Sequence, residues 1–124
     1  YNVENGSIRN QRIFARFSEA GGLPDVATLD AEGRLWCALW DGGRIVRLNE
    51  KGEIDHTIQL PTMKVSSLTF AGEGNSDIYI TTAGGNKPEV IDPLAGALFR
   101  IKSEVCGVPE FYSRIVVPDV QELT

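Results

Sequence analysis

Residues 26–60 read VATLDAEGRLWCALWDGGRIVRLNEKGEIDHTIQL. Short apolar runs alternate in this segment with polar turns that contain glycine, and no run has the period of three to four residues that marks a helix. Hairpin loops of three to five residues usually need one residue at positive φ, which glycine adopts at no steric cost. The segment therefore predicts four antiparallel strands, at residues 26–30, 35–40, 44–48 and 54–60.

A second four-stranded meander can be laid over the first. Strands are predicted at residues 65–70, 78–82 and 97–102, with a fourth near Phe111 and an insertion at 84–94. Repeats of four short strands at this period are typical of propeller blades, although antiparallel sandwiches also contain meanders.

The chain upstream of these meanders is expected to be the outer half of a preceding blade. Residues 1–8 resemble a strand end and a glycine-containing turn, and residues 11–17 are predicted to form another strand. We therefore expect an all-β chain of about two and a half propeller blades. Its expected parts are a partial blade over 1–20, a blade over 21–61 and a blade over 62–124.

Composition limits the classes of partner. The 124 residues include 12 Lys and Arg against 17 Asp and Glu, a net charge of -5 that argues against nucleic acid as a partner. No apolar run approaches the roughly 20 residues of a membrane helix, and no signal-peptide pattern is present, so we expect a soluble cytoplasmic protein. Cys37 and Cys106 have neither disulfide-framework nor zinc spacing, and both are predicted to be buried free thiols.

Five segments together resemble the senescence-marker-protein, gluconolactonase and luciferin-regenerating-enzyme family. Residues 22–40, GLPDVATLDAEGRLWCALW, are similar to the family pattern G-x-P-D-G, a short strand, then D-x-E-G-x-L-W-V-A-x-W. The other four segments, in chain order, are YNVENGSIRNQR at 1–12, GGRIVR at 42–47, YITTA at 79–83 and PLAGALF at 93–99.

This resemblance implies a site as well as a fold. Members of the family are six-bladed propellers with one divalent cation in the central channel, held by an early Glu, a mid-chain Asn and the Asp of the P-D-G motif. The cation polarises a small sugar lactone for hydrolysis, and the Asp is the candidate base. By resemblance, Asp25 is this catalytic and metal-binding residue. Hard oxygen ligands suit Ca²⁺ or Mg²⁺, and Zn²⁺ and Mn²⁺ are further candidates. A carboxylate just ahead of an innermost strand would also lie at the channel mouth.

Two departures from the family pattern limit what this chain does alone. Val26 replaces the usual Gly, which removes easy access to positive φ after Asp25 and adds bulk there. The matching Glu and Asn ligands lie upstream of Tyr1 in the family pattern, and Asn2 and Asn5 do not replace them. We therefore expect the C-terminal section of a metal-dependent lactonase, without a full active site in this chain alone.

The alternative is a non-catalytic propeller fragment that serves as a binding or assembly module. An open stack of blades exposes a sheet face and strand edges that invite pairing, so a homo-oligomer is predicted.

The aromatic and histidine candidates are expected to be structural. Trp36 and Trp40 lie at the same strand parity and could line a sugar site, but packing between blades is favoured. His56 has no nearby Ser, Cys or carboxylate motif, and a surface position without a catalytic role is expected.

The polar candidates also have structural explanations that involve no ligand or catalysis. The carboxylate of Asp25 could simply cap its own turn. Asp30 and Glu32 are expected to form a solvated acidic hairpin turn. Ser66 and Ser67 are expected to form hydrogen bonds within an inner strand.

Overall fold

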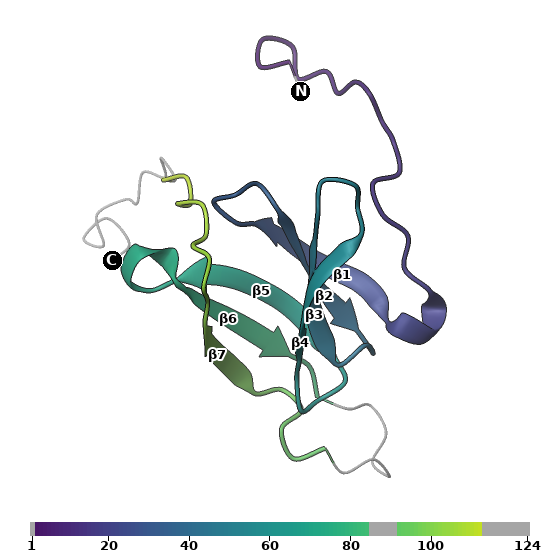
Figure 1. Ribbon diagram of the computed structural model, residues 1–124, viewed down its shortest axis with the longest axis vertical. Coiled ribbons are helices and arrows are strands. Elements are labelled where there is room, and N and C mark those ends of the chain that lie inside the picture. Colours follow the sequence, from purple (N-terminus) through teal and green to yellow (C-terminus); the bar gives the residue numbers. More distant parts are fainter. Residues whose placement is uncertain (1, 85–91, 113–124) are drawn as a thin grey trace, which may run out of the picture.

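The computed structural model describes residues 2–84 and 92–112, which form two antiparallel β-sheets (Figure 1). The first sheet has the order β1-β2-β3-β4 and the second the order β5-β6-β7. The strands are β1 (Leu23–Leu29), β2 (Leu35–Trp40), β3 (Arg44–Leu48), β4 (Ile54–Gln59), β5 (Val65–Ala71), β6 (Asp77–Thr82) and β7 (Leu98–Lys102). The only described helices are the short turns η1 (Glu19–Gly21) and η2 (Glu73–Asn75), and neither is long enough to cross a membrane. The prediction of an all-β chain built from meanders is confirmed.

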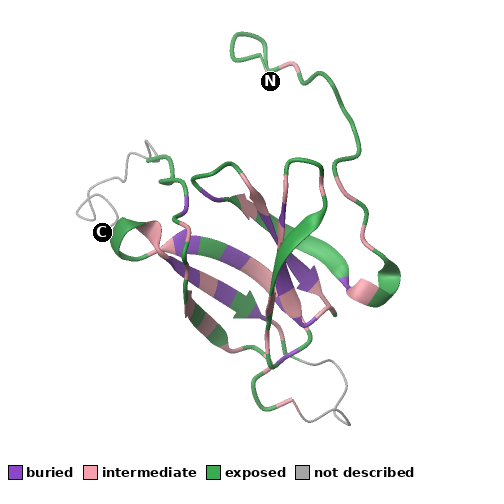
Figure 2. Ribbon diagram, viewed as in Figure 1, coloured by how far each residue is buried: buried purple, intermediate pink, exposed green. Residues whose placement is uncertain are grey.

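The main hydrophobic core lies between the two sheets, where β2 and β1 pack against β5. Buried side chains come from both sheets at alternate positions, because successive side chains of a strand point to opposite faces (Figure 2). They are Trp36, Ala38, Ile45, Val65, Leu68, Phe70, Ile78 and Ile80.

A second cluster covers the other face of the first sheet. Cys37, Leu39, Val46 and Leu48 are buried there, and Ala15 and Phe17 of the N-terminal segment pack against them. This segment extends away from the sheets toward the N-terminus (Figure 1).

The strand predicted at residues 11–17 is wrong. These residues form no ladder with another strand. An extended segment counts as a strand only when its backbone groups pair with a neighbour, and here it makes side-chain contacts with the sheet instead.

The predicted fourth strand of the second meander is also not found in the described residues. Residues 103–112 contain only an isolated bridge between Gly107 and Asp30, and Phe111 is 97% exposed. The rest of the predicted region, residues 113–124, lies outside the described part of the chain, as do residues 85–91 of the predicted insertion. Residues 103–107 instead run back to the first sheet, where Gly107 lies so close to Phe70 that an added Cβ would come within 2.1 Å of the Phe70 Cβ.

Candidate functional site

Asp25 lies in a β-bulge of β1. Pro24 is opposite Leu39 and Ala27 is opposite Cys37, so three steps along β1 match only two along β2. A bulge of this kind turns the local side chains away from the regular alternation, and bulges are common beside active sites. Asp25 is therefore inside the strand rather than just ahead of it, because β1 begins at Leu23 and not at Val26.

The bulge holds the Asp25 side chain at an open hollow. The hollow is lined by Leu23, Pro24, Asp25 and Trp40. Among the described residues, the Asp25 carboxylate takes part in no hydrogen bond or ion pair. The pKa of the Cys37 thiol is raised, mainly because the thiol is buried. A hydrogen bond to the backbone of Asp25 lowers this pKa, and the negative charge of the Asp25 carboxylate raises it. The alternative in which the Asp25 carboxylate caps its own turn is not found among the described residues.

Val26 causes no backbone strain at this bulge. The non-glycine residues at positive φ in the described chain are Asn10, Asp41 and Asn75. Val26 therefore has a negative φ, and the residue is 39% exposed. The conformation of the bulge does not depend on glycine at this position.

The second sheet carries an equivalent bulge. Val65 is opposite Thr82 and Ser67 is opposite Thr81, so Ser66 is the extra residue of β5. The Ser66 Oγ lies 2.9 Å from the Thr81 Oγ1, which confirms the expected hydrogen bonding of this inner strand at Ser66. Both first strands of the two meanders thus place a polar side chain at the same register position.

The two tryptophans have different environments. Trp36 is 3% exposed in the core, as predicted, and its ring meets Phe70 edge to face. The prediction of a core position is wrong for Trp40, which is only half-buried. It shares a face with Trp36 but is the last residue of β2, where the face leaves the sheet interface and reaches the hollow beside Asp25.

The described residues supply one candidate cation ligand at this hollow. A carboxylate with no other partner fits a hard divalent cation as a single ligand. Within residues 2–84 and 92–112, no group of three or more His, Cys, Asp and Glu side chains is arranged to hold a metal ion.

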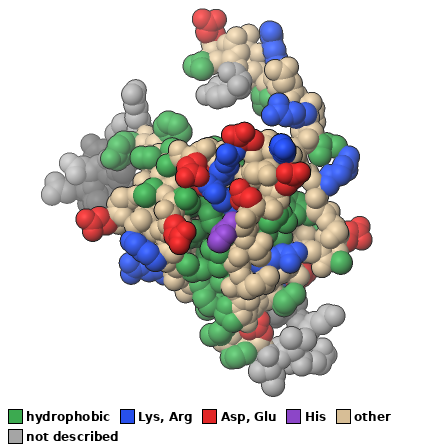
Figure 3. Space-filling view, viewed as in Figure 1, with side chains coloured by type: hydrophobic (Ala, Val, Ile, Leu, Met, Phe, Trp, Pro, Cys, Tyr) green, Lys and Arg blue, Asp and Glu red, His purple; other side chains and the backbone are tan. Residues whose placement is uncertain are grey.

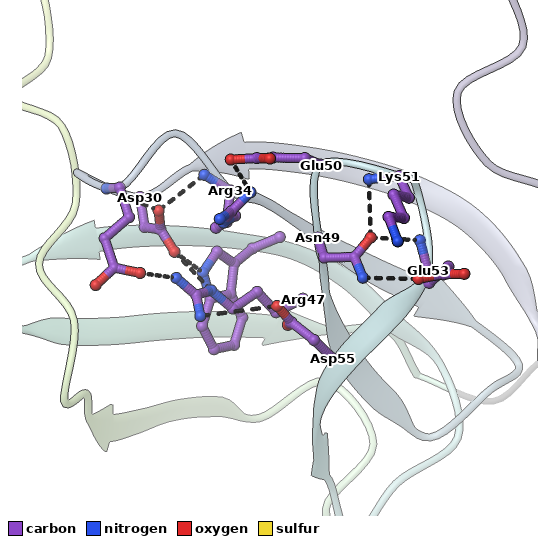
Figure 4. Close-up of polar contacts among 10 residues, drawn as sticks. Asp30, Arg34, Arg47, Asn49, Glu50, Lys51, Glu53 and Asp55 are labelled. Carbon is purple, nitrogen blue, oxygen red and sulfur yellow. Dashed lines mark hydrogen bonds and ion pairs between the residues drawn. The ribbon is translucent and has the colours of Figure 1, made fainter.

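A separate charged network surrounds Asp30, which is fully buried (Figure 4). Its carboxylate accepts hydrogen bonds from the Trp36 Nε1 at 2.9 Å and the Arg47 Nε at 2.8 Å. The backbone N–H groups of Glu32 and Arg34 donate to the same carboxylate at 3.0 and 2.9 Å. The expectation of a solvated turn is therefore wrong for Asp30, whereas Glu32 is exposed and pairs with Arg47 from outside.

The second sheet repeats this arrangement. Arg47 is opposite Trp36 in the first sheet, and Arg100 is opposite Tyr79 in the second. The Arg100 Nη2 lies 2.8 Å from the carboxylate of Asp77, whose side chain is 4% exposed. The Arg47–Asp30 and Arg100–Asp77 pairs each lie within one sheet, and none of the four residues lines the hollow at Asp25.

Comparison with known proteins identifies the family. Residues 1–84 match the family model described as the SMP-30/Gluconolactonase/LRE-like region. The chain belongs to this family. The match covers β1 to β6 and includes Asp25, which this SMP-30/gluconolactonase/LRE-like chain carries in the bulge described above.

Relatives of this SMP-30/gluconolactonase/LRE-like chain are longer than the chain itself. It is 36% identical over 122 residues to the pentonolactonase XacC of Haloferax volcanii, covering 93% of this chain and 42% of that protein. It is 36% identical over 116 residues to the regucalcin of Gallus gallus, covering 90% of this chain and 39% of that protein. The chain thus spans about two fifths of the length of these relatives.

Solved structures give the same result for the fold. A luciferin-regenerating enzyme superposes with a TM-score of 0.75 at 30% identity, over 87% of this chain and 38% of that one. A calcium-binding protein, regucalcin from Agrobacterium tumefaciens, superposes with a TM-score of 0.72 at 25% identity, over 84% and 36%. The two sheets of this family member are therefore those of a β-propeller fragment.

The larger cleft of the SMP-30/gluconolactonase/LRE-like chain lies away from Asp25. Its volume is about 480 Å³, and its lining includes Trp36, Arg47, His56 and residues 101–105. Figure 3 shows the histidine at the surface among charged side chains. The His56 ring meets Trp36 edge to face, at 5.8 Å between centroids, so its expected surface position is confirmed.

The two cysteines of this family member differ. Cys37 is a buried free thiol, as predicted, but the prediction is wrong for Cys106, which is exposed. The backbone carbonyl of Cys106 accepts a hydrogen bond from the Ala31 N–H, and the neighbouring Gly107 occupies the buried position against Phe70. The segment is therefore anchored by its backbone, and the thiol points outward.

The charged pairs predict a pH dependence of stability. Burial alone raises the pKa of Asp30, but hydrogen bonds from the backbone, the indole and the guanidinium outweigh it and hold this pKa below its ordinary value of 3.8. Arg100 and Lys102 lower the pKa of Asp77 in the same direction, against a raising effect of burial.

A lowered folded-state pKa means that the unfolded chain binds more protons at acid pH, so stability rises with pH there. We expect a constant free energy of unfolding above about pH 5 and a loss as the pH falls from there through the folded-state pKa values. Urea unfolding between pH 3 and 7 measures this. The Asp30→Asn variant should lose less free energy of unfolding between about pH 5 and pH 3 than the wild-type chain. An equal loss in the two proteins would contradict the assignment to Asp30.

Proposed function

We propose that this chain is a section of a metal-dependent sugar lactonase that hydrolyses an aldonolactone when the complete propeller surrounds Asp25. The observation that carries the proposal is the Asp25 carboxylate, held by a bulge at an open hollow with no partner among the described residues. A relative named pentonolactonase, 36% identical over 93% of the chain, supports a lactone as the substrate class.

The chemistry requires a base and a polarised carbonyl. Asp25 accepts a proton from the water that attacks the lactone carbonyl carbon, the ring C–O bond breaks, and the leaving oxygen takes up a proton to give the open aldonic acid. A divalent cation bound beside Asp25 would polarise that carbonyl. Asp25 lines the hollow together with the apolar residues Leu23 and Pro24.

The complete activity belongs to the complete protein. The chain spans 42% of the pentonolactonase and 39% of the chicken regucalcin, and its described residues provide one carboxylate at the hollow. A single carboxylate does not make a specific cation site. The chain alone is therefore expected to be inactive.

Lactone opening by the complete protein tests the proposal. D-gluconolactone and a pentonolactone are supplied separately, and acid release is followed with a pH indicator. We expect activity that EDTA abolishes and that Ca²⁺, Mn²⁺, Zn²⁺ or Mg²⁺ restores, because the cation polarises the carbonyl. The 124-residue chain serves as the inactive control. A complete protein that binds a cation and opens neither class of lactone would contradict the proposal.

A second candidate is a non-catalytic binding or assembly module. The exposed apolar side chains on the edge strands of the two sheets favour it, since Leu23 and Leu29 on β1 are 57% and 48% exposed and Leu98 on β7 is 64% exposed. Such side chains invite another blade or a second copy of the chain. Calorimetric titration of the complete protein with Ca²⁺ separates the candidates, because a metal-dependent lactonase requires tight cation binding and a non-catalytic module does not. A homo-oligomer remains a prediction, and a clean monomer in light scattering at high concentration would count against it.

A further inference from the structure

Trp40 lines the hollow of Asp25, and Lys64 lies against the Trp40 ring. Trp40 is directly opposite Leu23 across the β1–β2 ladder, and its side chain lines the hollow that holds Asp25. The Lys64 Nζ lies 5.0 Å from the centroid of the Trp40 ring. A carboxylate and an aromatic ring therefore line the hollow, and an ammonium group lies next to it, over the same ring.

The position of Lys64 is fixed by the backbone. The Ala83 N–H donates a hydrogen bond to the Lys64 carbonyl at 2.9 Å, where β5 begins and β6 ends. Within the described chain, the Lys64 ammonium forms no ion pair and makes a cation–π contact with Trp40. A half-buried lysine with only an aromatic partner remains available to an anionic ligand.

The three side chains match the parts of an opened sugar lactone. A half-buried indole offers an apolar surface to the C–H groups of a sugar chain. The ammonium group can donate charge-assisted hydrogen bonds to a carboxylate. Asp25 can accept hydrogen bonds from hydroxyl groups of the same molecule.

We propose that Trp40 and Lys64 form the substrate and product subsite beside Asp25, with Trp40 packing against the carbon chain of the sugar and Lys64 binding the carboxylate that ring opening creates. This inference rests on the proposed lactonase function and adds two specificity-determining residues to it. The preferred ligand is a polyhydroxylated carboxylate, and neither a neutral polyol nor a simple carboxylate satisfies both residues.

The indole N–H signals of the complete protein in ¹H–¹⁵N NMR spectra test the subsite. Sodium D-gluconate is the probe, with glucitol for the polyol alone and sodium acetate for the carboxylate alone. The Trp40 signal, assigned by its loss in Trp40→Leu, should move with gluconate more than with glucitol or acetate. The Trp36 signal is an internal reference, because that indole is buried and donates to Asp30.

Variants measure the two contributions. Trp40→Leu should weaken gluconate binding about tenfold, the effect of losing an interface aromatic anchor worth somewhat over 1 kcal/mol. Lys64→Met should weaken it about fivefold and leave glucitol binding unchanged, because only the ion pair is lost. Lys51→Met, which removes an exposed lysine from the turn between β3 and β4, is the matched control and should bind gluconate normally.

Failure of the subsite and failure of the lactonase proposal can be told apart in the same samples. If the wild-type protein opens lactones but gluconate leaves the Trp40 signal in place, or both variants bind normally, the subsite is wrong and the function stands. If the signal moves as expected but no lactone is opened with any cation, the subsite stands as a sugar-acid site and the lactonase proposal is wrong.

Discussion

Replacing Asp30 with alanine is expected to lower the free energy of unfolding by about 3 kcal/mol, the lower end of the range for breaking a buried ion pair. The variant leaves the indole N–H of Trp36 and the backbone N–H of Arg34 without their acceptor in a buried position. Arg47 keeps Glu32 and Asp55 as partners, so its charge is not isolated, which places the loss at the lower end. Urea unfolding at pH 7 followed by tryptophan fluorescence measures the change.

The second sheet provides the matched control for this prediction. Asp77 has the equivalent role there, but its partners Arg100 and Lys102 are 63% and 70% exposed. Water can therefore replace the lost carboxylate at both cations, and Asp77→Ala should cost less than Asp30→Ala. A larger loss for Asp77→Ala would show that burial of the cation does not determine the strength of these pairs.

Strand positions could be predicted because each strand depends on local sequence. Alternating apolar residues and glycine turns placed β2 and β3 at their observed bounds and gave β4 and β5 to within one residue. The predicted strand began at Val26 and missed residues 23–25, because Pro24 and Asp25 have the composition of a turn although the pairing of β1 with β2 continues across the bulge to Leu23. Residues 11–17 have the pattern of a strand but lack a partner, and pairing is a property of the whole sheet.

Burial of Asp30 could not be read from its own neighbours. The sequence around it, Asp-Ala-Glu-Gly, is that of a solvated turn, and the covering segment comes from Cys106 and Gly107 far along the chain. One signal was available in the sequence. The register of β2 and β3 places Trp36 opposite Arg47, so two hydrogen-bond donors converge on the end of the strand that carries Asp30.

The candidate site was predicted only in part for a similar reason. Resemblance to the family gave Asp25, but the alternation of β2 assigned Trp40 to the core with Trp36. Alternation says which face a side chain occupies and not where that face ends. The side chain at the end of the strand is the one that the mouth exposes, and Lys64 reaches it only because the two sheets meet at this point.

Replacing Asp25 with asparagine is expected to lower kcat of the complete protein for a sugar lactone by about 10² to 10⁴, the usual contribution of a positioned general base. Asparagine has nearly the same shape but cannot accept the proton and is a weaker cation ligand. Asp25 is exposed and makes no polar contact with the described residues, so the free energy of unfolding should change by less than about 0.5 kcal/mol.

The turn that follows β2 offers the matched control for Asp25. Asp41 is also an exposed carboxylate near the hollow, directly after Trp40, and its φ of 59° is one that asparagine tolerates. Asp41→Asn should therefore keep wild-type kcat and stability. If both variants lose activity equally, the negative charge of the mouth as a whole is what matters. If Asp25→Asn retains more than about a tenth of the activity, Asp25 is not the base, because a lost general base costs about a hundredfold or more.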